Sequence, residues 1–258
     1  MKTIAFQGEL GAYSHEACLS ARPNCKALPC KSFEEVISAV NNNVADLAML
    51  PVENTTYGRI ADIHRLLPES GLHIIDEVFT RVKINLLGLP GERLEDIESA
   101  EAHLVLLPQA SAFLEENNIR GIRAVDSAGA AAALKESKTK GVGVLASKLA
   151  AEIYDLKILA ENIEDSDHNT TRFLLMSSRP DNTRRGDTKM MTTFIFQVRN
   201  IPAALYKAMG GFATNGVNMT KLESYMVGGS FSATQFYADI EGHPDDSNVK
   251  LAMDELSY

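Results

Sequence analysis

The order of apolar and polar positions in residues 3–91 predicts a series of short strands and helices. Apolar runs of strand length alternate with segments of helical periodicity. The expected elements are strands at residues 3–8 and 45–54, helices at 12–21 and 32–43, and two strand-like runs within 71–91. Ser32 is expected to cap the second helix, with Glu35 at the capping-box position, and the strand at 45–54 should enter a loop at Pro51. Strands alternating with helices predict a parallel sheet with helices on its faces.

The next segment repeats one theme, in which a strand is followed by a small polar cap and an alanine-rich helix. A strand-like run and a helix are expected within residues 99–118, and two further strand-helix pairs within 123–137 and 141–156. Asp126 with Ser127, and then Ser147, should open the last two helices. A strand at 171–178 closes this part of the chain. Residues 177–190 are rich in Arg, Asp, Pro and Gly without apolar periodicity, which predicts a linker.

Beyond the linker the pattern predicts the order β-α-β-β-α, typical of a ferredoxin-like α+β module that lacks its last strand. The strands are expected at 191–200, 217–227 and 230–242, and the helices within 201–216 and 244–256. Gly228 and Gly229 are expected to form a hairpin turn between the second and third strands.

Composition and charge exclude several classes of protein. The 258 residues are 45% hydrophobic and carry a formal net charge of −9, so a packed core is expected and nucleic acid or an anionic membrane surface is not an expected partner. No run of 18 apolar residues and no signal peptide is evident. Three cysteines without metal-ligand spacing indicate free thiols in a reducing cytoplasm and no metal site.

Five places could bind a small anionic molecule, and each also has an ordinary structural interpretation. Helix starts at Gly11–Ser14 and at Ser127 offer backbone N–H groups, or are simply capped helices. The loop "ENTT" at residues 53–56 follows a buried strand, where α/β proteins place ligand-binding groups, or is an Asx-turn. Gln109 follows a strand-like run and is a weak signal alone.

The fifth place is "NTTRF" at residues 169–173. A threonine hydroxyl can donate a hydrogen bond to a leaving oxygen, and arginine can hold a carboxylate. The alternative is that β-branched residues begin a strand here. No nucleotide-binding motif, HExxH motif or Ser-His-Asp order occurs.

Together these segments resemble the prephenate dehydratase family with a C-terminal ACT domain. The resemblance is carried by "FQGELGAYS", "PVENTTYG", "DSAGAA", "NTTRF" and "MTKLES", in that order along the chain. It implies a catalytic region at 1–180 shaped like a periplasmic binding protein, with one lobe at about 1–78 and 160–180 and the other at about 79–159. It implies an ACT domain at 190–258.

The resemblance also implies an activity and residues that perform it. Members convert prephenate to phenylpyruvate, releasing water and carbon dioxide, and aromatisation of the ring drives the reaction without a cofactor. The family's catalytic threonine corresponds to Thr171, with Arg172 and Glu53 beside it in the expected site. The expected substrate-binding residues are Gly11, Ser14, Asn54, Thr55, Gln109, Ser127, Ala128, Asn169, Thr170 and Phe173.

The ACT domain implies inhibition by L-phenylalanine and assembly into a homodimer or homotetramer. The expected effector-binding residues are Ala203, Ala204, Leu205, Asn218, Glu223 and Ser224. Two segments depart from the family's usual pattern: Gly-Ala-Leu-Val is Ala-Ala-Leu-Tyr at 203–206, and Glu-Ser-Arg-Pro is Glu-Ser-Tyr-Met at 223–226. Arogenate dehydratase and a non-catalytic small-molecule sensor with the same fold are the alternative functions.

Overall fold

The chain divides into two compact units, Met1–Pro180 and Asp181–Tyr258, each described by itself below. The computed structural model describes residues 1–184, 186, 188–226 and 233–257. The expected hairpin turn at Gly228 and Gly229 lies outside these described residues.

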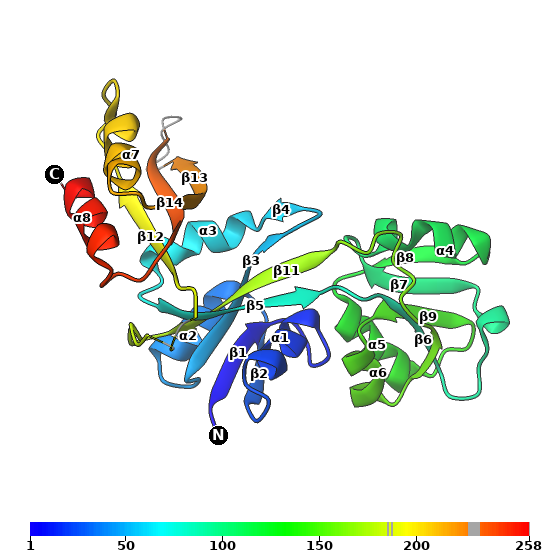
Figure 1. Cartoon of the computed structure of the whole chain (residues 1–258). Helices are drawn as coiled ribbons and strands as arrows, with labels where there is room; N and C mark the ends of the chain where they lie inside the picture. Colours follow the sequence, from blue (N-terminus) through cyan, green and yellow to red (C-terminus); the bar gives the residue numbers. More distant parts are fainter. Residues whose placement is uncertain (185, 187, 227–232, 258) are drawn as a thin grey trace. The chain divides into compact units, whose positions relative to one another are not determined.

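The first unit contains two α/β lobes, each built around its own sheet (Figure 1). The first sheet has the order β2-β1-β3-β11-β5, with β4 paired to β3. Its strands are β1 Thr3–Gln7, β2 Lys26–Cys30, β3 Leu47–Asn54, β4 Gly58–Arg59, β5 His73–Arg81 and β11 Thr170–Ser177. The edge strand β2 was not predicted, because "KALPC" has no apolar alternation and contains Pro29, which an edge strand tolerates.

The prediction of a parallel sheet holds for β1, β2 and β3, but the complete sheet is mixed. Strand β11 pairs antiparallel with both β3 and β5. It enters the sheet after the chain has crossed to the second lobe and returned, so no local pattern indicates its direction. The predicted loop at Pro51 is also wrong, since β3 continues through Pro51 to Asn54. The pairing with β11 has a bulge at this point, where a residue without an N–H is tolerated.

The second sheet has the order β10-β6-β9-β7-β8 and is also mixed. Its strands are β6 Asn85–Gly88, β7 Ser99–His103, β8 Arg120–Ala124, β9 Val142–Ala146 and β10 Lys157–Ala160. Two chain segments connect the lobes, one between β5 and β6 and the other between β10 and β11 (Figure 1). The helices of the unit are α1 Tyr13–Ala21, α2 Phe33–Asn41, α3 Ala61–Leu66, α4 Ser111–Glu116, α5 Ser127–Ser137 and α6 Lys148–Tyr154.

The predicted helix caps are confirmed, with one change of partner. Ser32, Asp126 and Ser147 each accept a hydrogen bond from the backbone N–H three residues later. Glu35 does not close the capping box on Ser32. Its carboxylate instead accepts the N–H of Lys31 at 2.8 Å.

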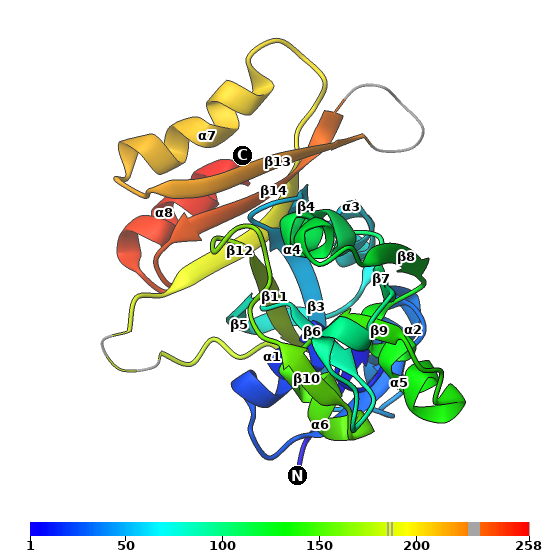
Figure 2. The same ribbon diagram turned by 90° about the vertical axis from the view of Figure 1, so that its right-hand side faces the viewer.

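The second unit is a three-stranded antiparallel sheet in the order β12-β14-β13, with α7 Ala204–Thr214 and α8 Ser247–Leu256 covering one face (Figure 2). The strands are β12 Met191–Gln197, β13 Met219–Met226 and β14 Ala233–Glu241. Phe196, Phe236 and Ala238 pack against Leu205 of α7. The predicted β-α-β-β-α order is confirmed, and β12 and β13 form the two edges of this sheet.

The start of α7 contains a strained residue. Ala203 caps the helix with φ of 62° and ψ of 9°, a left-handed conformation that disfavours any residue with a Cβ atom. Replacing Ala203 with glycine should raise the free energy of unfolding by about 1 kcal/mol, because glycine adopts this conformation without the steric cost. Urea denaturation of the full chain measures the change. The matched control Ala213→Gly, at a right-handed helical position of α7, should lower the free energy of unfolding. A lower free energy of unfolding for Ala203→Gly would contradict the expected stabilisation.

Candidate functional site

Thr171 lies at the start of β11 and is hydrogen-bonded to a residue far away in the sequence. Its Oγ atom accepts a hydrogen bond of 2.9 Å from Asn54 Nδ2 at the end of β3. The two residues are directly paired across the antiparallel strands, so their side chains project from the same face of the sheet. The predicted threonine and the predicted polar loop are thus parts of one arrangement.

The loop backbone determines how the Asn54 amide is oriented. Its Oδ1 atom accepts the N–H groups of Thr56 at 2.8 Å and Tyr57 at 3.1 Å. The amide oxygen must therefore face the loop, and the NH₂ group must face Thr171. Because Thr171 Oγ accepts from this group, its own O–H proton remains available to another acceptor. The Asx-turn expected for this loop is therefore present, and it orients the Asn54 amide toward Thr171.

A chain of side-chain amides continues from Asn54 into the second lobe. Asn54 Nδ2 also donates to Asn169 Oδ1 at 2.6 Å, and Asn169 Nδ2 donates to Gln109 Oε1. Gln109 Nε2 reaches the carbonyl of Val105 at 2.6 Å and the hydroxyl of Tyr57 at 3.3 Å. Gln109 was a weak signal in the sequence, yet the structure joins it to the Thr171 cluster.

Thr55 uses its hydroxyl to fasten the loop to the chain that enters β11. Thr55 Oγ1 donates to the carbonyl of His168 at 2.6 Å and accepts the N–H of Thr170 at 2.9 Å. The backbone N–H of Thr55 donates to the carbonyl of Thr170 at 3.0 Å. These three bonds hold the loop against β11, so the structure favours a positioning role for Thr55.

Arg172 does not lie beside the Thr171 hydroxyl. Successive residues of a strand point to opposite faces, and Arg172 pairs with Glu53 while Thr171 pairs with Asn54. The guanidinium is buried and donates to Glu77 Oε2 at 2.7 Å and to Glu53 Oε1 at 3.2 Å. The sequence offers Arg172 as a possible ligand of a substrate carboxylate, but in the structure its guanidinium binds two carboxylates of the protein on the other face.

Gly11 is needed for packing between the lobes. A Cβ atom on Gly11 would lie 2.8 Å from the Cα of Ala150, and the glycine has a φ of 91°. Its N–H donates to His15 Nδ1 at 3.1 Å, and its carbonyl accepts the Ser147 hydroxyl. Burial lowers the pKa of His15, so the neutral ring that this bond requires is favoured. Close approach of two backbones therefore explains this glycine without a ligand.

The other helix start, at α5, already has a carboxylate on it. Asp126 Oδ1 accepts the N–H of Gly129 at 2.6 Å. Ser127 Oγ accepts the N–H of His103 at 3.1 Å, and Ala128 is buried. An added anion at this helix end would lie near the Asp126 charge, which weakens the prediction of a carboxylate site there.

The remaining expected site residues have diverse surroundings. Phe173 is buried in the core with Ile4 and Phe6, so its side chain has a packing role. Ser14 is half-buried in the first turn of α1. Thr170 precedes Thr171 in β11, so its side chain projects from the face that carries Arg172.

The expected effector residues are divided between two faces of the second unit. Ala203, Ala204 and Leu205 form the start of α7, and Ser224 pairs with Phe236, whose side chain packs on the helices. Glu223 pairs with Tyr237 on the opposite face, near Lys221. Asn218 immediately precedes β13 and accepts the N–H of Glu241 through its carbonyl.

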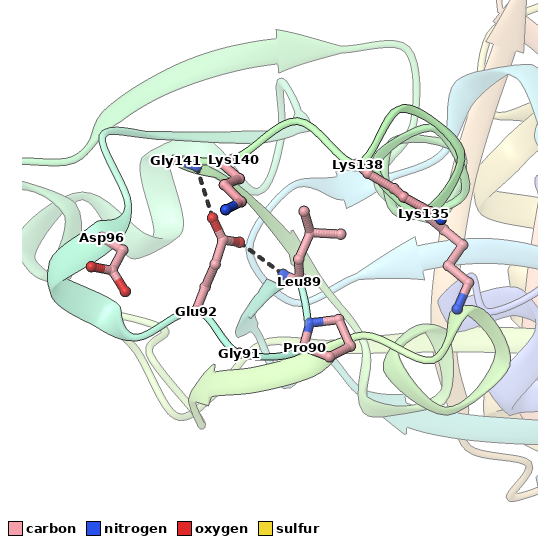
Figure 3. Close-up of a pocket in the computed structure, with 9 residues that line it drawn as sticks. All are labelled: Leu89, Pro90, Gly91, Glu92, Asp96, Lys135, Lys138, Lys140 and Gly141. Atoms are coloured by element: carbon pink, nitrogen blue, oxygen red, sulfur yellow. Dashed lines mark hydrogen bonds between the residues drawn. The ribbon is translucent and has the colours of Figure 1, made fainter.

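A hollow of about 700 Å³ lies in the second lobe, and none of the expected site residues lines it (Figure 3). Its lining residues are Leu89, Pro90, Gly91, Glu92, Asp96, Lys135, Lys138, Lys140 and Gly141. Glu92 is used internally, since it accepts the N–H groups of Leu89 and Gly141. Within the described ranges no group of three His, Cys, Asp or Glu side chains could hold a metal ion, and no helix is long and apolar enough to cross a membrane.

Two residues of this region were not selected from the sequence. Tyr57 donates its hydroxyl to the carbonyl of Val105 at 2.8 Å and so links the Asn54 loop to the second lobe. Glu77 completes the ion pairs of Arg172. Glu77 could have been found, because a glutamate within a predicted strand of the sheet is expected to have a cationic partner when it is partly shielded from solvent.

Comparison with known proteins gives one consistent result. The family model described as prephenate dehydratase matches residues 4–181. The chain is 49% identical over its whole length to a bifunctional N-acyl-homoserine lactone acylase/prephenate dehydratase from Komagataeibacter europaeus, covering 92% of that protein. It is 38% identical to arogenate dehydratase/prephenate dehydratase 1 from Arabidopsis thaliana, over 98% of this chain and 68% of the relative.

A solved structure shows the same similarity in three dimensions. The crystal structure of prephenate dehydratase from Arthrobacter aurescens in complex with L-Phe is 27% identical in sequence, with a TM-score of 0.88. The similarity covers 98% of this chain and 85% of that one. The second unit of this chain is therefore included in the match.

Proposed function

The chain belongs to the prephenate dehydratase family, and we propose that it converts prephenate to phenylpyruvate with Thr171 as the proton donor to the leaving hydroxyl. The single observation that carries the role of Thr171 is the hydrogen bond from Asn54. This bond occupies a lone pair of the Thr171 oxygen and leaves the hydroxyl proton directed elsewhere.

The reaction needs one proton and little else from the protein. The bond between the ring and its carboxylate breaks to release CO₂, and its electron pair enters the ring. The ring C–O bond breaks, and the departing oxygen takes the Thr171 proton to leave as water. Solvent then returns a proton to the Thr171 oxygen. A hydrogen-bond donor held in place where negative charge develops lowers the barrier effectively, because the protein does not have to reorganise as the charge appears.

The other residues of the site hold this donor in place. Asn54 orients Thr171, while Asn169 and Gln109 extend the network to the second lobe. Thr55 fastens the loop. Arg172, with Glu53 and Glu77, is proposed to stabilise the adjoining strands from the opposite face, since its guanidinium is already bonded to two carboxylates.

An ultraviolet assay for phenylpyruvate, with purified protein and prephenate, tests the activity. If the wild-type chain forms no phenylpyruvate while a known prephenate dehydratase does so in the same assay, the proposal is rejected. The binding-protein alternative is then favoured. The same experiment with arogenate tests the second candidate. The Arabidopsis relative carries both substrates in its name, and the two kcat/KM values decide the preference.

We also propose control by L-phenylalanine through the second unit, in a cytoplasmic homodimer or homotetramer. The Arthrobacter structure, which this chain matches over 98% of its length, contains L-Phe. Edge strands β12 and β13 offer backbone groups for pairing between copies. Calorimetry with L-phenylalanine and light scattering of the full chain test the two parts separately. Absence of a heat of binding at millimolar L-phenylalanine would contradict the proposed control by this ligand. A mass equal to that of the monomer would contradict the proposed assembly.

A further inference from the structure

Thr80 carries a hydroxyl whose environment is unusual. Its Oγ1 atom is shielded from solvent and has no hydrogen-bond partner among the residues that the structure describes. A buried hydroxyl is normally paired, so an unpaired one calls for a physical explanation. The β-branched shape of threonine suits a strand, but valine has nearly the same shape. Strand propensity alone therefore does not explain the hydroxyl of Thr80.

The strand register places Thr80 next to Thr171. Thr171 of β11 pairs with Thr80 of β5 on one side and with Asn54 of β3 on the other. Residues directly opposite in antiparallel strands have side chains on the same face, with Cβ atoms about 4.5–5.5 Å apart. Asn54, Thr171 and Thr80 therefore form one row across three strands, with the proposed proton donor in the middle.

The hydrogen-bond capacities of the row are complementary. The Thr171 oxygen has two lone pairs and one proton. Asn54 donates to one lone pair, and the proton is assigned to the leaving group under the proposed function. The second lone pair can accept one more donor. The Thr80 hydroxyl can serve as this donor after rotation about its Cα–Cβ bond.

We propose that Thr80 is a positioning residue for catalysis, which donates a hydrogen bond to the Thr171 oxygen as that oxygen gives up its proton. As the C–O bond of the substrate breaks, the proton of Thr171 moves to the departing oxygen, and negative charge develops on the Thr171 oxygen. Donors from Asn54 and Thr80 on either side stabilise this charge and make the Thr171 hydroxyl more acidic. The inference rests on the proposed function of Thr171.

The test is Thr80→Val, which keeps the shape and removes the hydroxyl. We expect kcat for prephenate to fall about tenfold, as for loss of one hydrogen bond to a charged group, with KM nearly unchanged. The melting temperature should stay the same or rise, because a buried unpaired hydroxyl is removed. Thr80→Ser should retain most of kcat. Thr3→Val, in β1 of the same sheet, is the matched control and should leave kcat unchanged.

Two further measurements separate failure of this inference from failure of the proposed function. In a Thr171→Ala background, adding Thr80→Val should lower kcat no further, because the oxygen that Thr80 supports is gone. A wild-type kcat for Thr80→Val, with low activity for Thr171→Ala, would overturn the role of Thr80 alone. A wild-type kcat for Thr171→Ala would overturn the proposed role of Thr171 as the proton donor. An equal loss from Thr80→Val with and without Thr171 would also contradict the inference.

Discussion

Replacing Thr171 with alanine should lower kcat for prephenate by about 10²–10³-fold, the usual effect of removing one preorganised donor from a developing oxyanion. KM should change little, because the interaction forms mainly as the C–O bond breaks. Thr171→Ser keeps a hydroxyl that can accept from Asn54 and should retain far more activity than alanine. Steady-state kinetics with the ultraviolet assay measure all three enzymes.

The structure supplies the controls for this experiment. Thr3→Ala alters a threonine of the same sheet in β1 and should keep its kcat. Asn54 still has Asn169 as a partner when Thr171 is removed, so the melting temperature of Thr171→Ala should remain near that of the wild type. A Thr171→Ala enzyme with normal turnover would assign the proton donor to another group. A Thr171→Ala enzyme that fails to fold would leave Thr171→Ser, compared with wild type, as the informative pair.

Removal of Arg172 is expected to have a large effect of a different kind, on stability. Arg172→Met leaves the carboxylates of Glu53 and Glu77 without their shared cation. Loss of one partner from a buried ion pair costs about 3 kcal/mol, and the partial exposure of both glutamates places the expected loss toward the lower end of the usual range. Urea denaturation of the full chain measures the change in the free energy of unfolding.

The charged partners provide a matched test of this explanation. The triple variant Arg172→Met, Glu53→Gln and Glu77→Gln removes both unpaired carboxylate charges and the repulsion between them. It should therefore recover a substantial part of the lost free energy of unfolding. Recovery of kcat in the same triple variant would confirm that Arg172 acts through the sheet. A triple variant that regains stability but remains inactive would instead show that Arg172 or Glu53 acts on the substrate directly.

The sequence alone could have predicted that Thr171 and Arg172 lie on opposite faces of the sheet. Once residues 171–178 are predicted as a strand, alternation of side chains already separates two consecutive residues onto opposite faces. Glu77 in the neighbouring apolar run was a second signal that Arg172 has a partner inside the protein. Thr171 and Arg172 were placed in one site because they are neighbours in the sequence. Neighbours in a strand point to opposite faces of the sheet, so they do not share a site.

What the sequence determined by itself is local. Residues 3–8, 123–137 and 141–156 formed the expected strands and helices, and Asp126 and Ser147 capped the helices as expected, because a cap depends on atoms three residues apart. The β-α-β-β-α order of the second unit followed from periodicity in the same way.

Only the tertiary structure decided how β11 is placed. Its antiparallel position between β3 and β5 brings Asn54 and Thr80 to either side of Thr171. Asn54, Asn169 and Gln109 come from three separate segments, and their hydrogen bonds exist only after both lobes have formed. Register between strands 90 to 120 residues apart depends on long-range packing, which no window of sequence contains. The motif at residues 169–173 therefore indicated which side chain to consider, and the fold determined which atoms act on it.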